Sequence, residues 1–164
     1  MYTTVGAQQS QEPLPVSKVQ VGTFDSRALA MAYYRSELFG RQIKEMRAEY
    51  EKAKEAGDEK RVRELEIVGS AQQELMHKQG FSTWQVDNIL KKINGELSEV
   101  AIQAEVDIII SKWSAVYQRS GVEFIDVTNI MVKLFDPDEQ TLRMIEEIQK
   151  QAPVPLEDLK NHQD

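Results

Sequence analysis

The apolar residues on the two sides of Ala56-Gly57-Asp58 mirror each other, and this symmetry constrains the fold more than any other feature of the chain. Before these residues the apolar positions step by 4, 3, 4 and 3, the heptad spacing of a coiled coil. They are Phe39, Ile43, Met46, Tyr50 and Ala53, and at matching distances beyond the turn lie Met76, Gln72, Gly69, Leu65 and Val62. The pattern predicts two long helices folded back on each other as an antiparallel hairpin. Because a lone two-helix hairpin buries little surface, it must project from a base or join an oligomer.

The expected hairpin, called the arm below, has recognisable ends. Asp25-Ser26 offers side-chain oxygens that cap a helix, and a helix from there to about residue 56 would be roughly 45 Å long. Gly57 favours a helix C-terminus, and Asp58 is placed to cap the return helix. Gly69 and Gln72 are small or polar residues at positions where the two helices of the arm should contact each other. Each is expected to cost about 1 kcal/mol or more of stability through lost packing. Either the arm bends there, or these two residues face another part of an assembly, or the register differs.

Charge is distributed unevenly along the chain. The net charge of −7 and the pI near 5.0 argue against nucleic acid as a partner, because phosphate binding needs a concentrated basic face. Residues 41–66 hold eight basic and eight acidic side chains, which is typical of a solvated helical surface. Residues 136–164 hold eight acidic and three basic side chains, so the C-terminal part carries most of the excess.

The rest of the chain predicts a small α+β base. Residues 18–24 alternate as a short strand, and residues 106–110 contain three successive isoleucines typical of a buried strand. Residues 115–118 and 122–125 are expected to add to the sheet. Gly80 is placed to end the return helix, Ser82 with Gln85 resembles a capping box, and the apolar spacing of residues 86–104 predicts one amphipathic helix. Two further helices are expected after Asp126 and after Asp136-Pro137.

The predicted organisation is one domain with two flanking segments. Residues 18–152 form an α+β domain whose small β-sheet base (residues 18–25 and 84–152) carries the long projecting arm (residues 26–80). Residues 1–17 are expected to be a disordered leader and residues 153–164 a flexible tail. The leader has neither the basic start nor the apolar run of a signal peptide, and it fits equally the start of a mature chain after removal of an export signal. The sequence contains no stretch that approaches a membrane span.

No constellation of residues predicts catalysis or a cofactor. The chain has no cysteine, and its two histidines, His77 and His162, lack ligand partners at helical spacing. Asp136 and Asp138 lack the full ligand spacing of an EF-hand, and helix capping accounts for them. The glycines are isolated, so they form no phosphate-binding loop. We therefore expect a protein that is not an enzyme and that has no metal or cofactor.

Two blocks of the chain resemble the Skp/OmpH family of periplasmic chaperones. The first is the opening strand Lys18-Val19-Gln20-Val21-Gly22-Thr23-Phe24-Asp25 leading into a long helix. The second is Val106-Asp107-Ile108-Ile109-Ile110, followed by Val116-Tyr117 and then by Asp126-Val127-Thr128. The resemblance covers about residues 18–150 and implies a homotrimer in which the small sheets assemble into a central barrel. It also implies that the arms enclose unfolded outer-membrane proteins. The chain differs in being acidic, where these chaperones are typically basic, and in having a shorter arm.

The expected function follows from shape and resemblance. It is a non-enzymatic, periplasmic or otherwise exported holdase whose partners are other copies of itself and unfolded clients. The alternative is a coiled-coil scaffold that spaces or tethers envelope components, or a cytoplasmic hairpin adaptor if Met1 is the natural start. Tyr33, Tyr34, Phe81 and Trp84 gather where arm meets base, either as core packing or as a client-binding surface. Trp113 is expected to fill the barrel or a subunit contact.

Overall fold

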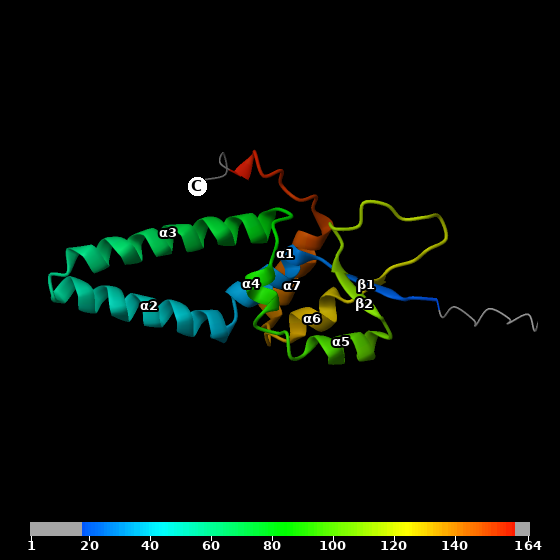
Figure 1. Cartoon of the computed structure of the whole chain (residues 1–164), viewed down its shortest axis with the longest axis horizontal. Coiled ribbons are helices and arrows are strands. Elements are labelled where there is room, and N and C mark those ends of the chain that lie inside the picture. The colour runs from blue at the N-terminus through cyan, green and yellow to red at the C-terminus, as the bar shows by residue number, and fades with distance from the viewer. Residues whose placement is uncertain (1–17, 160–164) are drawn as a thin grey trace, which may run out of the picture.

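The computed structural model describes residues 18–159, and this part of the chain is α+β, as the sequence predicts (Figure 1). The leader at residues 1–17 and the last residues, 160–164, lie outside the described part. In chain order the elements are β1 (Val21–Phe24), α1 (Ser26–Tyr34), α2 (Glu37–Glu55), α3 (Glu59–Phe81), α4 (Asp87–Leu90), α5 (Leu97–Ala104), β2 (Ile108–Ser111), β3 (Ile125–Asp126), α6 (Thr128–Lys133) and α7 (Glu139–Lys150).

The sheet joins segments that the whole α2–α3 region separates in the sequence. Its strand order is β2-β1-β3, and both pairs are parallel. Val21 lies opposite Ile108 and Gly22 opposite Ile109, so the prediction that these two segments share one sheet is confirmed. The core lies between this sheet and the helices around α1, which contacts α3, α6 and α7. Its largest fully buried apolar side chains are Leu29, Ile89, Met131 and Ile145.

Helices α2 and α3 lie side by side and extend away from the base (Figure 1). Their 19 and 23 residues correspond to lengths of about 28 and 35 Å. Gly57 takes the left-handed conformation (φ +68°) that lets the chain reverse, and the Asp58 carboxylate accepts from the backbone N–H of Arg61. The chain therefore turns back at the position that the symmetric apolar pattern indicates.

The prediction of one continuous helix over residues 26–56 is wrong. Helix α1 ends at Tyr34, and α2 begins after Ser36. Ser36 is extended, its hydroxyl accepts from the backbone N–H of Phe39, and the same hydroxyl donates to the carbonyl oxygen of Tyr33 at 2.6 Å. A serine that hydrogen-bonds to the backbone in this way competes with the helical ladder and starts a new helix. The break gives α1 to the base and leaves α2 to the projecting pair.

The predicted single helix over residues 86–104 is also wrong, because it is divided into α4 and α5. Between them the chain makes tighter turns, such as the bond from the Ile93 N–H to the Leu90 carbonyl, and Asn94-Gly95 favours such a turn. The expected capping box at Ser82 does not form: Ser82 is the buried C-terminal cap of α3, and Val86 is the residue at the start of α4.

The expected strand at residues 115–118 is absent from the described part of the chain, and the expected strand at 122–125 reduces to the two residues of β3. Strands β2 and β3 lie on opposite sides of β1, so residues 112–124 must cross the sheet and cannot extend either strand. Val116 is fully exposed in this loop. At the last helix, Asp138 rather than Asp136 is the cap, accepting from the Thr141 N–H at 2.7 Å.

Candidate interaction surfaces

The two faces of the sheet have different neighbours. A Cβ atom added to Gly22 would lie 3.1 Å from side-chain atoms of both Val106 and Val127, so this face of β1 packs directly on the core. Alternation along the strand places Val21 and Thr23 on the opposite face, together with Ile108, the partner of Val21. Thr23 is itself buried, so this side is exposed only at the start of the strands, around Val19, Val21 and Ile108. We call this exposed part the open face. In Figure 1 α5 and α6 lie below the sheet, whereas the loop of residues 112–124 arches above it.

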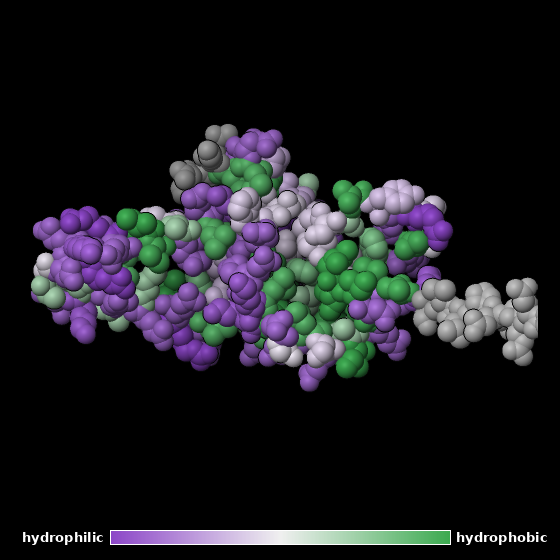
Figure 2. All heavy atoms as spheres, in the orientation of Figure 1, coloured by the Kyte–Doolittle hydropathy of each residue, from purple (hydrophilic) through white to green (hydrophobic). Residues whose placement is uncertain are grey.

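The open face exposes an unusual amount of apolar surface. Ile108 is 48% exposed and Val19 56%, and the loop beside them carries Val116 and the 81%-exposed Tyr117. Figure 2 shows apolar residues gathered at this end of the molecule, whereas the far end of α2 and α3 is hydrophilic. Parallel sheets are normally covered on both faces. In addition, β2 is at one end of the strand order, so its outer edge pairs with no strand in the described residues. Both features are typical of a surface that binds another protein chain.

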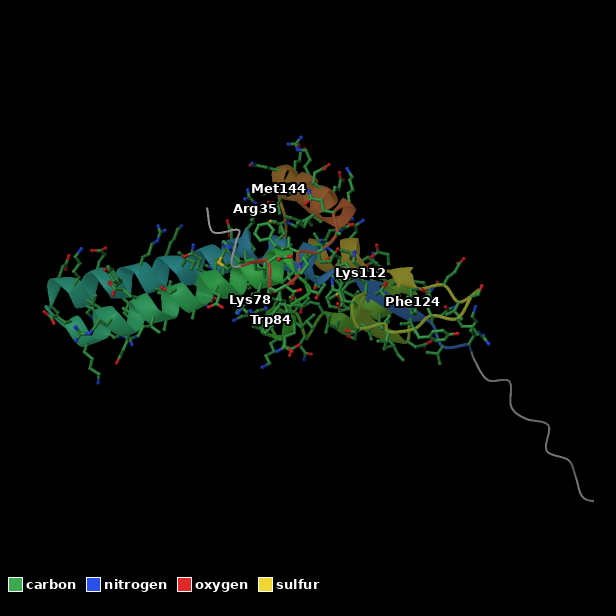
Figure 3. The ribbon with its side chains drawn as sticks, turned by 90° about the horizontal axis from the view of Figure 1, so that it is seen from above. Arg35, Lys78, Trp84, Lys112, Phe124 and Met144 are labelled. Carbon is green, nitrogen blue, oxygen red and sulfur yellow. The ribbon has the colours of Figure 1, made fainter. Side chains whose placement is uncertain are left out.

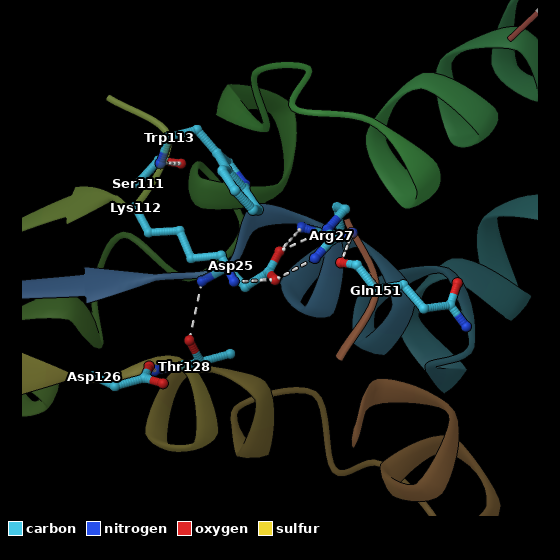
Figure 4. Close-up of polar contacts among 8 residues, drawn as sticks. All are labelled: Asp25, Arg27, Ser111, Lys112, Trp113, Asp126, Thr128 and Gln151. Carbon is cyan, nitrogen blue, oxygen red and sulfur yellow. Dashed lines mark hydrogen bonds and ion pairs between the residues drawn. The ribbon is translucent and has the colours of Figure 1, made fainter. Parts of the chain in front are cut away.

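A buried polar cluster holds the carboxyl ends of β1 and β2 to helix α1 (Figure 4). The Asp25 carboxylate accepts from Arg27 Nη2 at 2.9 Å and forms an ion pair with Lys112 Nζ at 2.6 Å. The side chains of Asp25 and Arg27 are each 1% exposed. Arg27 also donates to the carbonyl oxygen of Gln151, and the Asp25 N–H donates to the hydroxyl of Thr128. The cluster thus ties together β1, β2, α6 and the end of α7.

The charges in this cluster set the protonation of Asp25. Burial alone raises the pKa of Asp25, but the hydrogen bonds and positive charges of Arg27 and Lys112 outweigh burial and hold this pKa below its usual value of 3.8. The carboxylate is therefore ionised at neutral pH, and its oxygens are used by neighbours within the fold. These contacts indicate a structural role. Within the chain Trp113 lies against the cations of Arg27 and Lys112, 5.1 and 4.5 Å from its ring centre, and its expected place in a barrel or a subunit contact stays a prediction.

Two of the predicted contact residues are packed at the junction of α1 with α2 and α3. Tyr33 is 3% exposed and lies edge-on to Phe135, and Tyr34 is half-buried. Phe39, in the first turn of α2, contacts both tyrosine rings, with ring centres 5.4 and 4.9 Å away. These side chains therefore belong to the interior of the junction.

The other two predicted residues are accessible. Phe81, 43% exposed, lines an open groove with Met31, Met144 and Ile148. Trp84 lies beside the ammonium group of Lys78, 5.1 Å from the ring centre (Figure 3). The groove at Phe81 is lined by neither tyrosine, so Phe81 offers a partner an apolar surface that is separate from the aromatic packing of Tyr33 and Tyr34.

Sequence reasoning missed the burial state of three residues, one on the open face and two in the interior. Ile108 was expected in a buried strand, yet it is half-exposed on the open face, at the start of β2. Gln79 lies on a charged helix and is nevertheless 1% exposed. Arg27 is also 1% exposed, and only its spacing two residues from the capping Asp25 offered a signal. Burial of polar side chains depends on tertiary packing, which periodicity does not report.

Two features were sought in the sequence, a metal site and a membrane-spanning segment, and the structure bears on both. Among residues 18–159, no three His, Cys, Asp or Glu side chains are grouped so that they could hold a metal ion. His77 instead lies edge-on to Phe81, and His162 is outside the described part. None of the helices within this range combines the length and the apolar character needed to cross a membrane. No protein-family model, curated protein or solved structure matches the chain.

Proposed function

We propose that this protein is a non-enzymatic, holdase-like chaperone of the cell envelope that assembles through its base and holds unfolded or membrane-protein clients between its projecting helices. One observation carries the proposal: the apolar open face lies at one end of the molecule, and the charge-dense α2–α3 pair extends from the other (Figures 1 and 2). Copies that cover their open faces with one another would leave every α2–α3 pair projecting outward.

Self-association is favoured by the exposed apolar residues and by the open edge of β2. Covering Ile108, Val19 and the loop residues Val116 and Tyr117 would remove apolar surface from water, at about 25 cal/mol for each Å². The outer edge of β2 offers backbone groups to a strand from another copy. A homotrimer, as the resemblance to the Skp/OmpH family implies, is the assembly that we propose.

Client binding is supported by isolated apolar residues on a charged surface. Ile67 and Val68 on α3 are 70% and 53% exposed, and Phe81 and Met144 line the groove near the base. Methionine side chains adapt to partners of different shape. Charged residues around these sites, with ion pairs such as Arg61–Glu64 and Lys78–Glu74, would keep a complex with an unfolded chain in solution.

The test uses two identical changes at two isoleucines. Ile108→Lys places a charge on the open face, and we expect the mass in light scattering to fall from a trimer to a monomer. Ile67→Lys places the same charge on α3, and we expect the trimer to remain while suppression of aggregation of an unfolded outer-membrane protein weakens. A wild-type chain that is monomeric, or that does not suppress aggregation at near-stoichiometric ratios, would refute the holdase proposal.

A scaffold without client binding is the second candidate, and the surface of the α2–α3 pair favours it. Arg61 forms ion pairs with Glu49 on α2 and with Glu64 on its own helix, so part of this surface is occupied by its own charges. A scaffold would form the same oligomer and would respond to Ile108→Lys in the same way. It would leave aggregation of the unfolded membrane protein unchanged, and Ile67→Lys would then have no effect in either assay.

A further inference from the structure

The α2–α3 pair joins the base where α1, α3, α4 and the α3–α4 connection meet around the buried side-chain amide of Gln79. The chain enters the pair at Ser36 and leaves it at Ser82. Between these points, in the last turn of α3, lies Gln79, with 1% of its surface exposed. Its partners come from α1, from α4 and from the connection between α3 and α4. A polar side chain so deeply buried is costly unless all its hydrogen-bonding groups are used.

The Gln79 amide uses both its donor and its acceptor groups. Its Nε2 donates to the carbonyl oxygen of Gln85 at 2.7 Å and to Oδ1 of Asn88 at 2.6 Å, and its Oε1 accepts from the hydroxyl of Tyr34. Burial raises the pKa of Tyr34, so its hydroxyl keeps its proton and remains a donor at neutral pH. Each bond fixes α3 to a different segment, so the amide restrains the helix in several directions at once.

Aromatic packing restrains α2 at the same level. Phe39 is 5% exposed and contacts the rings of Tyr33 and Tyr34 on α1. The Tyr33 hydroxyl donates to Oε1 of Gln42, one turn further along α2, at 3.1 Å. Interlocked rings in a packed interior resist displacement. Both helices of the pair are therefore held to α1 over their base-proximal turns.

In the distal part of the pair the side-chain polar contacts between α2 and α3 are exposed ones, from the Tyr50 hydroxyl to Glu66 and between Arg61 and Glu49. Beyond Phe39 and up to the turn, Ala53 is the buried residue of α2, and Leu65 is the buried apolar residue of α3. Gly69 lies between this small seam and the junction, and a Cβ atom added there would meet nothing within 4 Å. Where few buried contacts join two helices, local bending costs little free energy.

We infer that Gln79, Tyr34 and Phe39 form a rigid joint that sets the direction of the α2–α3 pair relative to the base, and that the pair bends only beyond Gly69. The joint would fix where each projecting pair points, whatever it binds. The inference concerns the single chain, so it does not depend on the proposed chaperone function.

The absence of cysteine makes the joint measurable with pairs of introduced spin labels. One label is placed at Glu99→Cys in the base, and the second at Lys44→Cys near the joint or at Lys60→Cys near the turn; all three positions are exposed. Dilution with unlabelled protein removes distances between copies. We expect a narrow distance distribution for the proximal pair and a broader one for the distal pair. A proximal distribution as broad as the distal one, or two equally narrow distributions, would overturn the inference.

Two variants test whether the amide is responsible. Gln79→Met keeps the length of the side chain and removes its hydrogen bonds, and Tyr34→Phe removes one of them with little change in volume. We expect each to broaden the proximal distribution, Gln79→Met as far as the width of the distal pair. Gln73→Met, at an exposed position of the same helix, is the matched control and should change nothing. If Gln79→Met prevents folding, Tyr34→Phe still decides the question.

The inference fails if neither Gln79→Met nor Tyr34→Phe broadens the proximal distribution in folded protein. Such a result would leave the trimer mass and the suppression of aggregation untouched. Conversely, a wild-type protein that is monomeric or does not suppress aggregation would still give the expected label distances. The proposed function and the joint can therefore fail separately.

Discussion

Two ion pairs of similar length lie in opposite environments in this protein. Arg27 and Asp25 meet at 2.9 Å in the base, where each side chain is 1% exposed. Arg61 and Glu49 meet at 2.5 Å between α2 and α3, where they are 42% and 52% exposed. The first pair is itself buried, with the partly exposed Lys112 as a further partner of Asp25, and the second lies in water that screens it. The contrast indicates that the base is held by buried polar contacts and packing, whereas the projecting pair is joined by a thin seam and a solvated surface.

The largest expected effect is at the buried pair. Asp25→Ala leaves the Arg27 guanidinium buried without its carboxylate, and we expect the free energy of unfolding to fall by about 3–5 kcal/mol. The change also removes the N-terminal cap of α1, since Asp25 Oδ1 accepts from the Arg27 N–H. Urea unfolding followed by circular dichroism measures the loss. Glu49→Ala is the matched control, and we expect it to leave the unfolding curve unchanged. Equal effects of the two changes would contradict the contrast.

A second comparison uses Gly22 in the base and Gly69 on α3; the larger effect is expected at Gly22. Gly22→Ala in β1 brings a methyl group within 3.1 Å of Val106 and Val127 on the core face of the sheet. Because these neighbours must shift to accept it, we expect a loss of about 1–3 kcal/mol in the free energy of unfolding. The same urea titration measures it. If Gly22→Ala is neutral or stabilising, this face of the sheet is packed less tightly than the contacts indicate.

The pH dependence of stability sharpens the assignment of Asp25. Its folded pKa lies below the ordinary value of 3.8, so the ion pair stabilises the fold at any pH above that value. As the pH falls below 3.8 toward the folded pKa, the unfolded chain takes up the proton first and the contribution is lost. We therefore expect the difference in unfolding free energy between wild type and Asp25→Asn to be constant from neutral pH to about pH 4 and to shrink below it. A difference that stays constant under acid would mean that Asp25 has an ordinary pKa.

Local signals in the sequence predicted the α+β class, the pairing of β1 with β2 and the reversal at Gly57. Each of these depends on a residue type with a strong intrinsic preference, such as the run of isoleucines or a glycine at positive φ. The errors have a common cause in tertiary context. In the sequence Ser36 resembles a surface serine inside a helix, whereas in the structure its hydroxyl bonds to the backbone of Tyr33 and Phe39 and divides the helix. Residues 115–118 have strand propensity, but the crossing between β2 and β3 leaves them no partner strand among residues 18–159.

The candidate surfaces were less predictable than the fold. The sequence places four aromatic residues near one junction: Tyr33, Tyr34, Phe81 and Trp84. The structure nevertheless buries Tyr33 and exposes Phe81. Gln79 has no sequence signal at all, because a glutamine on a charged helix is most often solvated. Its burial arises where α1, α3 and α4 meet, and no local pattern reports such a meeting.

The smallest expected effect is at Gly69 on α3, and it decides between two explanations of the weak seam. A methyl group there meets no atom within 4 Å, so Gly69→Ala should stabilise the helix by about 0.5–1 kcal/mol through a lower entropy of the unfolded chain. Thermal unfolding of the assembled protein and of Ile108→Lys measures the change in both states. Stabilisation in both means that Gly69 is a solvent-facing gap where the pair bends. Destabilisation confined to the assembled protein would mean that a segment of another copy packs against this glycine, because a methyl group then has no room.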